Sequence, residues 1–285
     1  MIYLLLAAVS SAAMALVLKF FQNTEGNRYG IILGNYLICI VISYLRLPDK
    51  ALVFAGSPVT VLCGIITGIF FVAGLVTMQT SIRHNGATLT AVFAKLGLVI
   101  SLAVSILAFG ERPKALQILG LILVTCAIVL INGSSTSGSG GAGGKPHTLS
   151  LFLALLSGGG GSAMAKVFEQ LGPRSEDELY FLYLFAVAAV LTGLLALHET
   201  KKTGLPLRIK EMAAGILVGV PNYYASFLIL PALVLLPAFI VYPAVSCGSI
   251  LIVMAVSALL FREKHSPRQR IGILLILAAL VLLNL

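Results

Sequence analysis

The chain alternates between long apolar runs and short polar connections. Each apolar run holds about 20 residues with few charges, which is the length that an α-helix needs to cross the hydrocarbon core of a bilayer. Most of the Lys and Arg residues lie in the connections. The pattern therefore predicts ten membrane-spanning helices, at about residues 2–21, 29–46, 58–80, 86–109, 115–132, 148–170, 179–197, 212–231, 238–261 and 267–284.

Two local signals predict interruptions in these runs. Polar residues from Gln79 to Asn85 mark a short turn between the third and fourth helices. Pro221 lies inside the eighth run, and we expect it to break that helix because proline has no backbone N–H. The Gly158 to Gly161 run lies inside an apolar helix, so we interpret it as a site of close helix packing.

The segments 86–132 and 239–284 follow the same plan. In each, an apolar helix ends in a turn of the form Phe-x-Glu-Arg or Phe-x-Glu-Lys, and a second apolar helix follows. Four pairs of identical residues lie 152 positions apart: Glu111 and Glu263, Gln117 and Gln269, Gly120 and Gly272, and Asn132 and Asn284. The module is therefore duplicated within the chain.

The duplication extends to the whole chain and predicts its domain organisation. Residues 1–132 and 148–285 each hold five predicted helices, and the Gly/Ser-rich residues 133–147 have the composition of a flexible linker. Because five is odd, two such halves cross the membrane in opposite directions, as in many transporters. We expect an all-α polytopic membrane protein whose ten helices form two inverted five-helix repeats.

The composition agrees with a membrane protein. Hydrophobic residues make up 59% of the chain and charged residues 10%, whereas soluble domains carry about 25% charged residues. The net charge of +9 is explained by loops that face anionic lipid headgroups, so no nucleic-acid partner is expected. The four cysteines lie far apart inside apolar runs, which predicts neither a disulfide nor a metal site.

The paired turns carry a resemblance to a known family. With Glu111, Gln117 and Gly120 in one half and their counterparts in the other, the chain resembles the drug/metabolite transporter superfamily, specifically its ten-span EamA-type members. The resemblance implies a bundle around a central cavity and alternating access for a small solute. It also implies both termini inside the cell, whereas the excess of Lys and Arg in the odd-numbered connections favours the opposite orientation. Both orientations stay open.

Lys95 is the sharpest candidate for a substrate-binding residue. It lies about ten residues into the fourth predicted helix, where a charged side chain costs roughly 2.5–3.5 kcal/mol unless it faces water or an anion. We expect it to bind a carboxylate or phosphate of the substrate, or to titrate as a coupling group. The alternative is a structural lysine that bonds to backbone carbonyls.

Other polar residues inside apolar runs are weaker candidates. Tyr242 and Ser246 lie one helical turn apart in the ninth helix, beside Pro243. Asn222 and Tyr223 follow Pro221 in the eighth helix, where freed carbonyls and broken helices often mark binding sites. The remaining substrate-binding candidates are Asn35 and Gln79.

Three glutamates have a structural interpretation beside a functional one. Glu169, near a span end, is a candidate coupling group, although a solvated ion pair explains it as well. Glu111 and Glu263 lie in turns rich in Arg and Lys, so we expect them to fix these turns through salt bridges. No nucleophile–histidine pair or phosphate loop occurs in the sequence, so we expect no enzyme activity, no cofactor and no metal.

The sequence thus predicts a secondary-active transporter of a small polar or anionic metabolite, such as an amino acid or organic acid. A flippase for a lipid headgroup or lipid-linked sugar is the alternative on the same fold, and a membrane enzyme or scaffold is a third. The expected partners are the solute and the bilayer, for a monomer or dimer in a plasma membrane, which we expect to be a bacterial inner membrane. Substrate identity, direction and coupling ion cannot be read from the residues.

Overall fold

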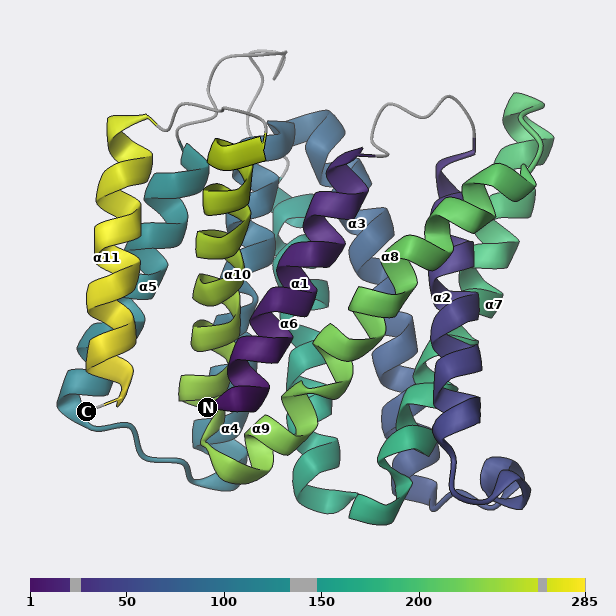
Figure 1. Ribbon diagram of the computed structural model, residues 1–285, viewed down its shortest axis with the longest axis horizontal. Helices are drawn as coiled ribbons and strands as arrows, with labels where there is room; N and C mark the ends of the chain where they lie inside the picture. The colour runs from purple at the N-terminus through teal and green to yellow at the C-terminus, as the bar shows by residue number, and fades with distance from the viewer. Residues whose placement is uncertain (21–26, 134–147, 261–265, 285) are drawn as a thin grey trace. The chain divides into compact units, whose positions relative to one another are not determined.

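The computed structural model describes residues 1–20, 27–133, 148–260 and 266–284, and its regular structure in these ranges is helical throughout (Figure 1). Two short 3-10 helices, η1 (Lys50–Phe54) and η2 (Arg174–Glu176), accompany the α-helices. The α-helices are α1 (Ile2–Phe20), α2 (Arg28–Arg46), α3 (Pro58–Leu96), α4 (Leu98–Phe109), α5 (Ala115–Gly133), α6 (Thr148–Leu171), α7 (Asp177–Thr203), α8 (Ile209–Phe227), α9 (Ile229–Leu235), α10 (Ala238–Leu260) and α11 (Pro267–Asn284).

The repeated glutamines have the same structural part in both halves. Gln117 is the third residue of α5, and its side-chain oxygen accepts a hydrogen bond from the backbone N–H of Lys114 at 2.9 Å. Gln269 is the third residue of α11 and accepts from the N–H of Ser266 at 2.8 Å. Each glutamine therefore reaches back to satisfy a backbone donor at the start of its helix.

The predicted turn at residues 79–85 is helical in the structure. The helix α3 runs through it from Pro58 to Leu96. Its axis nevertheless turns back, because the Thr90 hydroxyl donates to the Ser81 hydroxyl at 2.8 Å, while nine residues of straight helix would separate them by about 13 Å. The turn is visible at the top of α3 in Figure 1. Asn85 contributes a bond to Ser150 on α6 at 2.9 Å.

The prediction that residues 86–109 form a single continuous helix is wrong. It is divided at Gly97 into the end of α3 and the separate helix α4. Gly97 approaches α6 so closely that a Cβ atom there would lie 2.6 Å from the Gly159 nitrogen and 2.7 Å from the Leu155 carbonyl oxygen. Around Gly97 the hydrogen bonds tighten to the i→i+3 pattern, as in a 3-10 turn.

The predicted break at Pro221 is also wrong, because α8 continues through this residue to Phe227. The interruption comes at Leu228, after which α9 begins. Helix α2 supports α8 just before the proline: Gly215 and Gly219 lie against the backbone of Asn35, where no Cβ atom fits. Packing of this kind lets a membrane helix tolerate proline.

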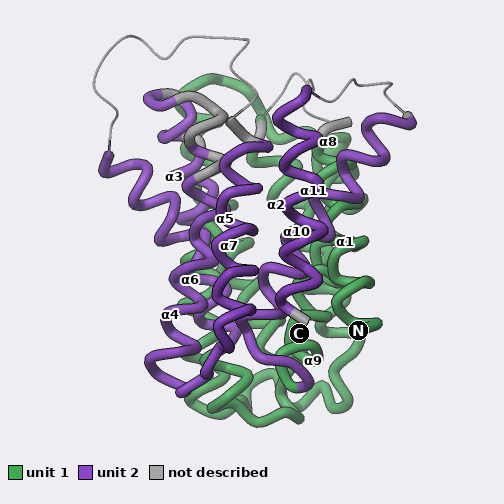
Figure 2. Tube along the Cα trace, turned by 90° about the vertical axis from the view of Figure 1, so that its left-hand side faces the viewer, with its two compact units in different colours: residues 1–72, 167–234 green, residues 73–166, 235–285 purple. Residues whose placement is uncertain are grey.

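The chain divides into two compact units, shown in green and purple in Figure 2. Unit 1 comprises residues 1–72 and 167–234, and unit 2 comprises residues 73–166 and 235–285. Each unit therefore draws on both halves of the sequence. The predicted linker at 134–147 lies outside the described residues.

In unit 1, α2 packs against α7 and α8, and α1 packs against α8. Glycines again set the close contacts. A Cβ atom on Gly64 would lie 2.8 Å from the Tyr183 Cβ, and one on Gly68 would lie 2.6 Å from the Leu184 carbonyl oxygen. An aromatic cluster joins the same helices, with Tyr36, Phe181, Phe185, Tyr223 and Phe227 among its members.

In unit 2, α5 pairs with α11. Gly120 faces Leu283 and Ala279, and its repeat counterpart Gly272 faces Ile131 and Ala127. The pairing is thus close to reciprocal, as expected for matched helices. The apolar core of this unit includes the fully buried residues Val124, Ala127, Ile128, Cys247, Ile276, Ala279 and Leu283.

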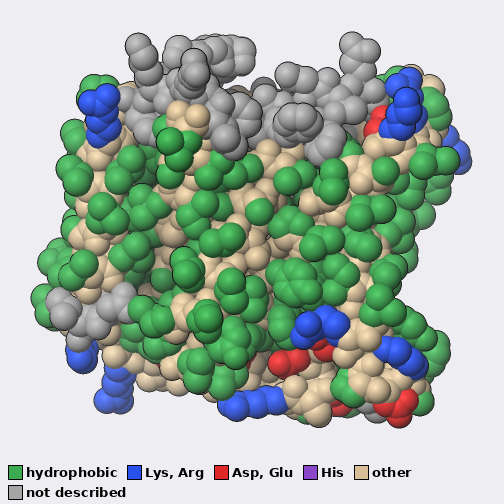
Figure 3. Space-filling view, in the orientation of Figure 1, with side chains coloured by type: hydrophobic (Ala, Val, Ile, Leu, Met, Phe, Trp, Pro, Cys, Tyr) green, Lys and Arg blue, Asp and Glu red, His purple; other side chains and the backbone are tan. Residues whose placement is uncertain are grey.

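The described helices have the properties of membrane-spanning segments. Six are long and apolar enough to cross a membrane: Tyr29–Arg46, Pro58–Ile82, Thr148–Leu171, Arg174–Thr203, Ile209–Leu235 and Ala238–Leu259. Shorter apolar helices lie at Ile2–Leu18, Phe93–Phe109 and Ala115–Ile131. In Figure 3, hydrophobic side chains cover the helices along most of their length, and charged side chains gather near helix ends.

Candidate substrate-binding sites

The candidate residues fall into two groups, one in each unit. Lys95, Tyr242 and Ser246 belong to unit 2, and Asn35, Asn222 and Tyr223 belong to unit 1. Gln79 lies in α3, and nothing of its side chain is described; Glu263 lies outside the described residues.

Lys95 lies in the last turn of α3, two residues before the break at Gly97. The residue as a whole is exposed, but its ammonium is desolvated by burial and lies close enough to the buried Cys247 thiol of α10 to interact with it electrostatically. It is thus directed toward α10. Within the described ranges, neither a carboxylate nor a hydrogen-bond acceptor pairs with it. The break places this cation at the negative end of the α3 dipole.

Glycine packing holds Lys95 in this position. The tetraglycine segment of α6 lies directly beside the end of α3: a Cβ atom on Gly158 would lie 2.7 Å from the Ala94 carbonyl oxygen, and one on Gly159 would overlap the Gly97 carbonyl. The interpretation of this segment as a packing surface is therefore confirmed. Backbone contact between α6 and the end of α3 fixes the helix that carries Lys95.

The two candidates on α10 differ in availability. Tyr242 is 5% exposed, and its hydroxyl donates to the Ser162 carbonyl of α6 at 2.6 Å. Ser246, one turn later, is half-buried, and its carbonyl accepts a hydrogen bond from the Ser249 hydroxyl at 2.9 Å. Its own hydroxyl has no partner in the part of unit 2 that the structure describes. Ser246 is therefore the residue of this pair that can still bind a ligand.

Asn35 and Asn222 are brought together in unit 1. The Asn222 side-chain nitrogen donates to the Asn35 side-chain oxygen at 3.1 Å, across the contact between α2 and α8. The Cys39 thiol donates to the Gly219 carbonyl at 3.3 Å beside them. Both asparagines are about 95% buried, so the pair fixes the crossing of the two helices and leaves one amide nitrogen and one amide oxygen for further bonds.

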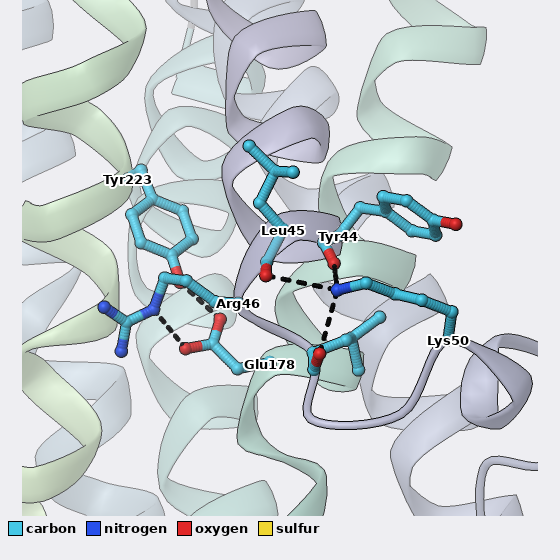
Figure 4. A network of polar contacts seen from close by, with 7 residues as sticks. Tyr44, Leu45, Arg46, Lys50, Glu178 and Tyr223 are labelled. Atoms are coloured by element: carbon cyan, nitrogen blue, oxygen red, sulfur yellow. Dashed lines mark hydrogen bonds and ion pairs between the residues drawn. The ribbon is translucent and has the colours of Figure 1, made fainter.

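Tyr223 belongs to a different network, shown in Figure 4. Its hydroxyl donates to the Glu178 carboxylate, whose other oxygen pairs with Arg46 Nε at 2.5 Å. The Arg46 guanidinium also lies 4.5 Å from the centre of the Phe227 ring. The Tyr223 hydroxyl is thus committed to an ion-pair network that joins the ends of α2, α7 and α8 in unit 1.

Glu111, predicted from the repeat, and Glu169, predicted from its place near a span end, make contacts that differ from the expected ones. Glu111 does not pair with Arg112 or Lys114 of its own turn; its carboxylate accepts from Lys166 Nζ at 3.0 Å and from the Ala238 N–H at 3.0 and 3.1 Å. Glu169 is half-buried near the end of α6 and accepts from the Gln170 side chain at 2.7 Å.

Comparison with protein families shows what part of this sequence is similar to. Residues 1–133 match the model of the EamA-like transporter family. This part of the chain is similar to EamA-like transporters. The match agrees with the resemblance to the EamA type of the drug/metabolite transporter superfamily over this part of the chain. The apolar helices are those of a multi-pass membrane protein.

No curated protein matches the chain. Among solved structures, one described only as a crystal structure of a protein is similar, with a TM-score of 0.71 and 15% sequence identity over 99% of this chain and 96% of the other. At this identity the likeness shows the fold alone. The chain therefore shares the fold of that protein over nearly its whole length.

Sequence reasoning located the polar residues but missed the residues with which they pair. Lys166 shares a helical face with Ser162, but its pairing with Glu111 joins positions 55 apart in the chain. The Arg46–Glu178 pair joins positions even farther apart. The signal available in the sequence was a charged residue near the end of an apolar run, and this signal does not indicate which residue it pairs with.

Proposed function

We propose that the protein is a secondary-active transporter that moves a small polar or anionic metabolite by alternating access, with ten spans in two inverted five-helix repeats. The EamA-like sequence of residues 1–133 and the equivalent glutamine caps on α5 and α11 support this proposal. The setting that we propose is a bacterial inner membrane, with the solute and the bilayer as partners.

One observation carries the substrate class: the Lys95 ammonium is buried near Cys247 of α10, and no described carboxylate pairs with it. A lysine inside the membrane needs water or an anion near it. An anionic group of the substrate supplies that charge, and the Ser246 hydroxyl on α10 offers a hydrogen bond in the same unit. The substrate that this chemistry favours is an amino acid or organic acid that presents a carboxylate.

A specific feature favours the alternative of a lipid-headgroup flippase. An apolar groove between α4 and α5 begins at Leu98, one turn after Lys95, and continues past Leu102 and Ile122 to Cys126. An acyl chain could occupy this groove while its phosphate headgroup binds Lys95. The two substrate classes share the anion at Lys95 and differ in whether the groove takes part.

A thermal-shift screen of the purified protein separates these classes. We expect small carboxylates to raise the unfolding temperature of the wild type, and K95M to lose this shift while K202M, which alters an exposed lysine at the end of α7, keeps it. Losing a charged hydrogen bond weakens binding by roughly 10- to 100-fold. Stabilisation by anionic lipids, with no response to small carboxylates, would select the flippase. A carboxylate shift that survives in K95M would refute the role of Lys95.

A further inference from the structure

Unit 2 contains a second lysine whose counter-ion is the protein's own carboxylate. The Lys166 side chain is 2% exposed, and its ammonium lies 3.0 Å from Glu111 Oε1. Glu111 is 14% exposed and comes from the turn after α4, so the pair has one buried and one accessible member. Both oxygens of Glu111 also accept from the Ala238 N–H, at the first residue of α10.

Helix α6 connects this pair to the region of Lys95. Gly158, Ser162 and Lys166 are spaced four residues apart, so they lie on one face of α6. Gly158 contacts Ala94, next to Lys95, and Ser162 accepts the hydrogen bond of Tyr242. From Gly158 to Lys166 the helix rises by about 12 Å. Lys166 thus lies about two turns of α6 from the contact with the end of α3 that carries Lys95, and Tyr242 bonds to α6 between them.

The two members of the pair differ in what they need. A buried ammonium is costly unless an opposite charge lies beside it. Glu111 has a second source of stabilisation, since it binds the N-terminal N–H of α10, where the helix dipole favours negative charge. It can therefore release Lys166 and keep a favourable partner. Lys166 is buried, so its ammonium is stabilised by an anion beside it.

We propose that Lys166 is an anion-binding site of unit 2 that Glu111 occupies in this structure, and that a free carboxylate exchanges with Glu111 there. The inference extends the proposed function by adding a second position for an anionic substrate, beyond Lys95. In the exchanged state the carboxylate of the solute contacts Lys166, while Glu111 remains on α10. Glu111 thus acts as a tethered substitute for the substrate.

Chemical rescue tests the exchange without knowledge of the natural substrate. E111A removes the resident carboxylate and leaves a hole beside Lys166, reached from the exposed side of Glu111. The purified full-length E111A protein is titrated with sodium acetate against sodium chloride at equal ionic strength, and thermal unfolding is followed. We expect acetate to raise the unfolding temperature of E111A by at least about 3 °C more than chloride does. Wild type should show a smaller difference, because Glu111 competes with acetate for Lys166.

Two further variants keep the test decisive. E111A/K166M should lose the acetate effect, and E111A/K95M should keep it, so the result does not depend on whether the proposed role of Lys95 holds. If E111A does not fold, E111S, whose short polar side chain also leaves space beside Lys166, replaces it. Absence of an acetate effect, or an equal effect in E111A/K166M, would overturn the proposal, since the pair would then be a structural salt bridge only.

Discussion

At the scale of single residues, the sequence located polar side chains but not their partners. Asn35 and Asn222 were separate candidates in the sequence, and the structure joins them through one hydrogen bond across α2 and α8. Lys95 was predicted to bind an anion of the substrate, which stays a prediction; within the described ranges no carboxylate pairs with it. Positions were easier to predict than partners for a physical reason. A polar residue is recognised as buried from the apolar residues on either side of it in the sequence, whereas its partner depends on how the helices pack.

The asparagine pair gives a prediction about stability. Asn222→Leu leaves the buried Asn35 amide without its partner, so we expect a loss of about 1–3 kcal/mol in unfolding free energy. Asn35→Leu should cost a similar amount, and the double variant should lose less than the sum of the two single variants. Denaturant unfolding in detergent measures all three. Strictly additive losses would show that the two amides do not interact.

At the scale of helices, hydrophobic runs predicted positions well and interruptions poorly. The starts of α2, α5, α10 and α11 fall within one residue of the predicted runs. The proline at position 221 did not end α8, and Gly97 divided a run that contains no proline. In both cases a neighbouring helix decides the outcome, because close backbone contact supports one helix and bends the other.

Contact of α6 with the end of α3 predicts a sharp difference between two glycines of unit 2. Gly159→Ala inserts a methyl group against the Gly97 carbonyl, so we expect a loss of about 1–3 kcal/mol and a displaced Lys95. Gly74→Ala is the matched control, since its Cβ atom would meet the Ser157 Cβ at 3.7 Å, an ordinary contact. Equal thermal stability of the two variants would contradict the packing account.

At the scale of the whole molecule, the sequence predicted the duplication but not the compact units. The sequence predicts residues 1–132 and 148–285 as two repeats, and each compact unit combines segments from both. The contacts of α5 with α11 and of α2 with α8 join helices of different halves. Hydrophobic periodicity reports which residues leave water, and in a membrane chain it does not report which helices meet.

Solute flux in proteoliposomes tests the central claim most directly. The probe is the small carboxylate that shifts the unfolding temperature most, supplied in radiolabelled form to vesicles that contain wild type, K95M, K95R or K202M. The account predicts saturable uptake by wild type and K202M, a loss of roughly 10-fold or more for K95M, and partial retention for K95R, which keeps the positive charge. Uptake by K95M at the wild-type rate would contradict it.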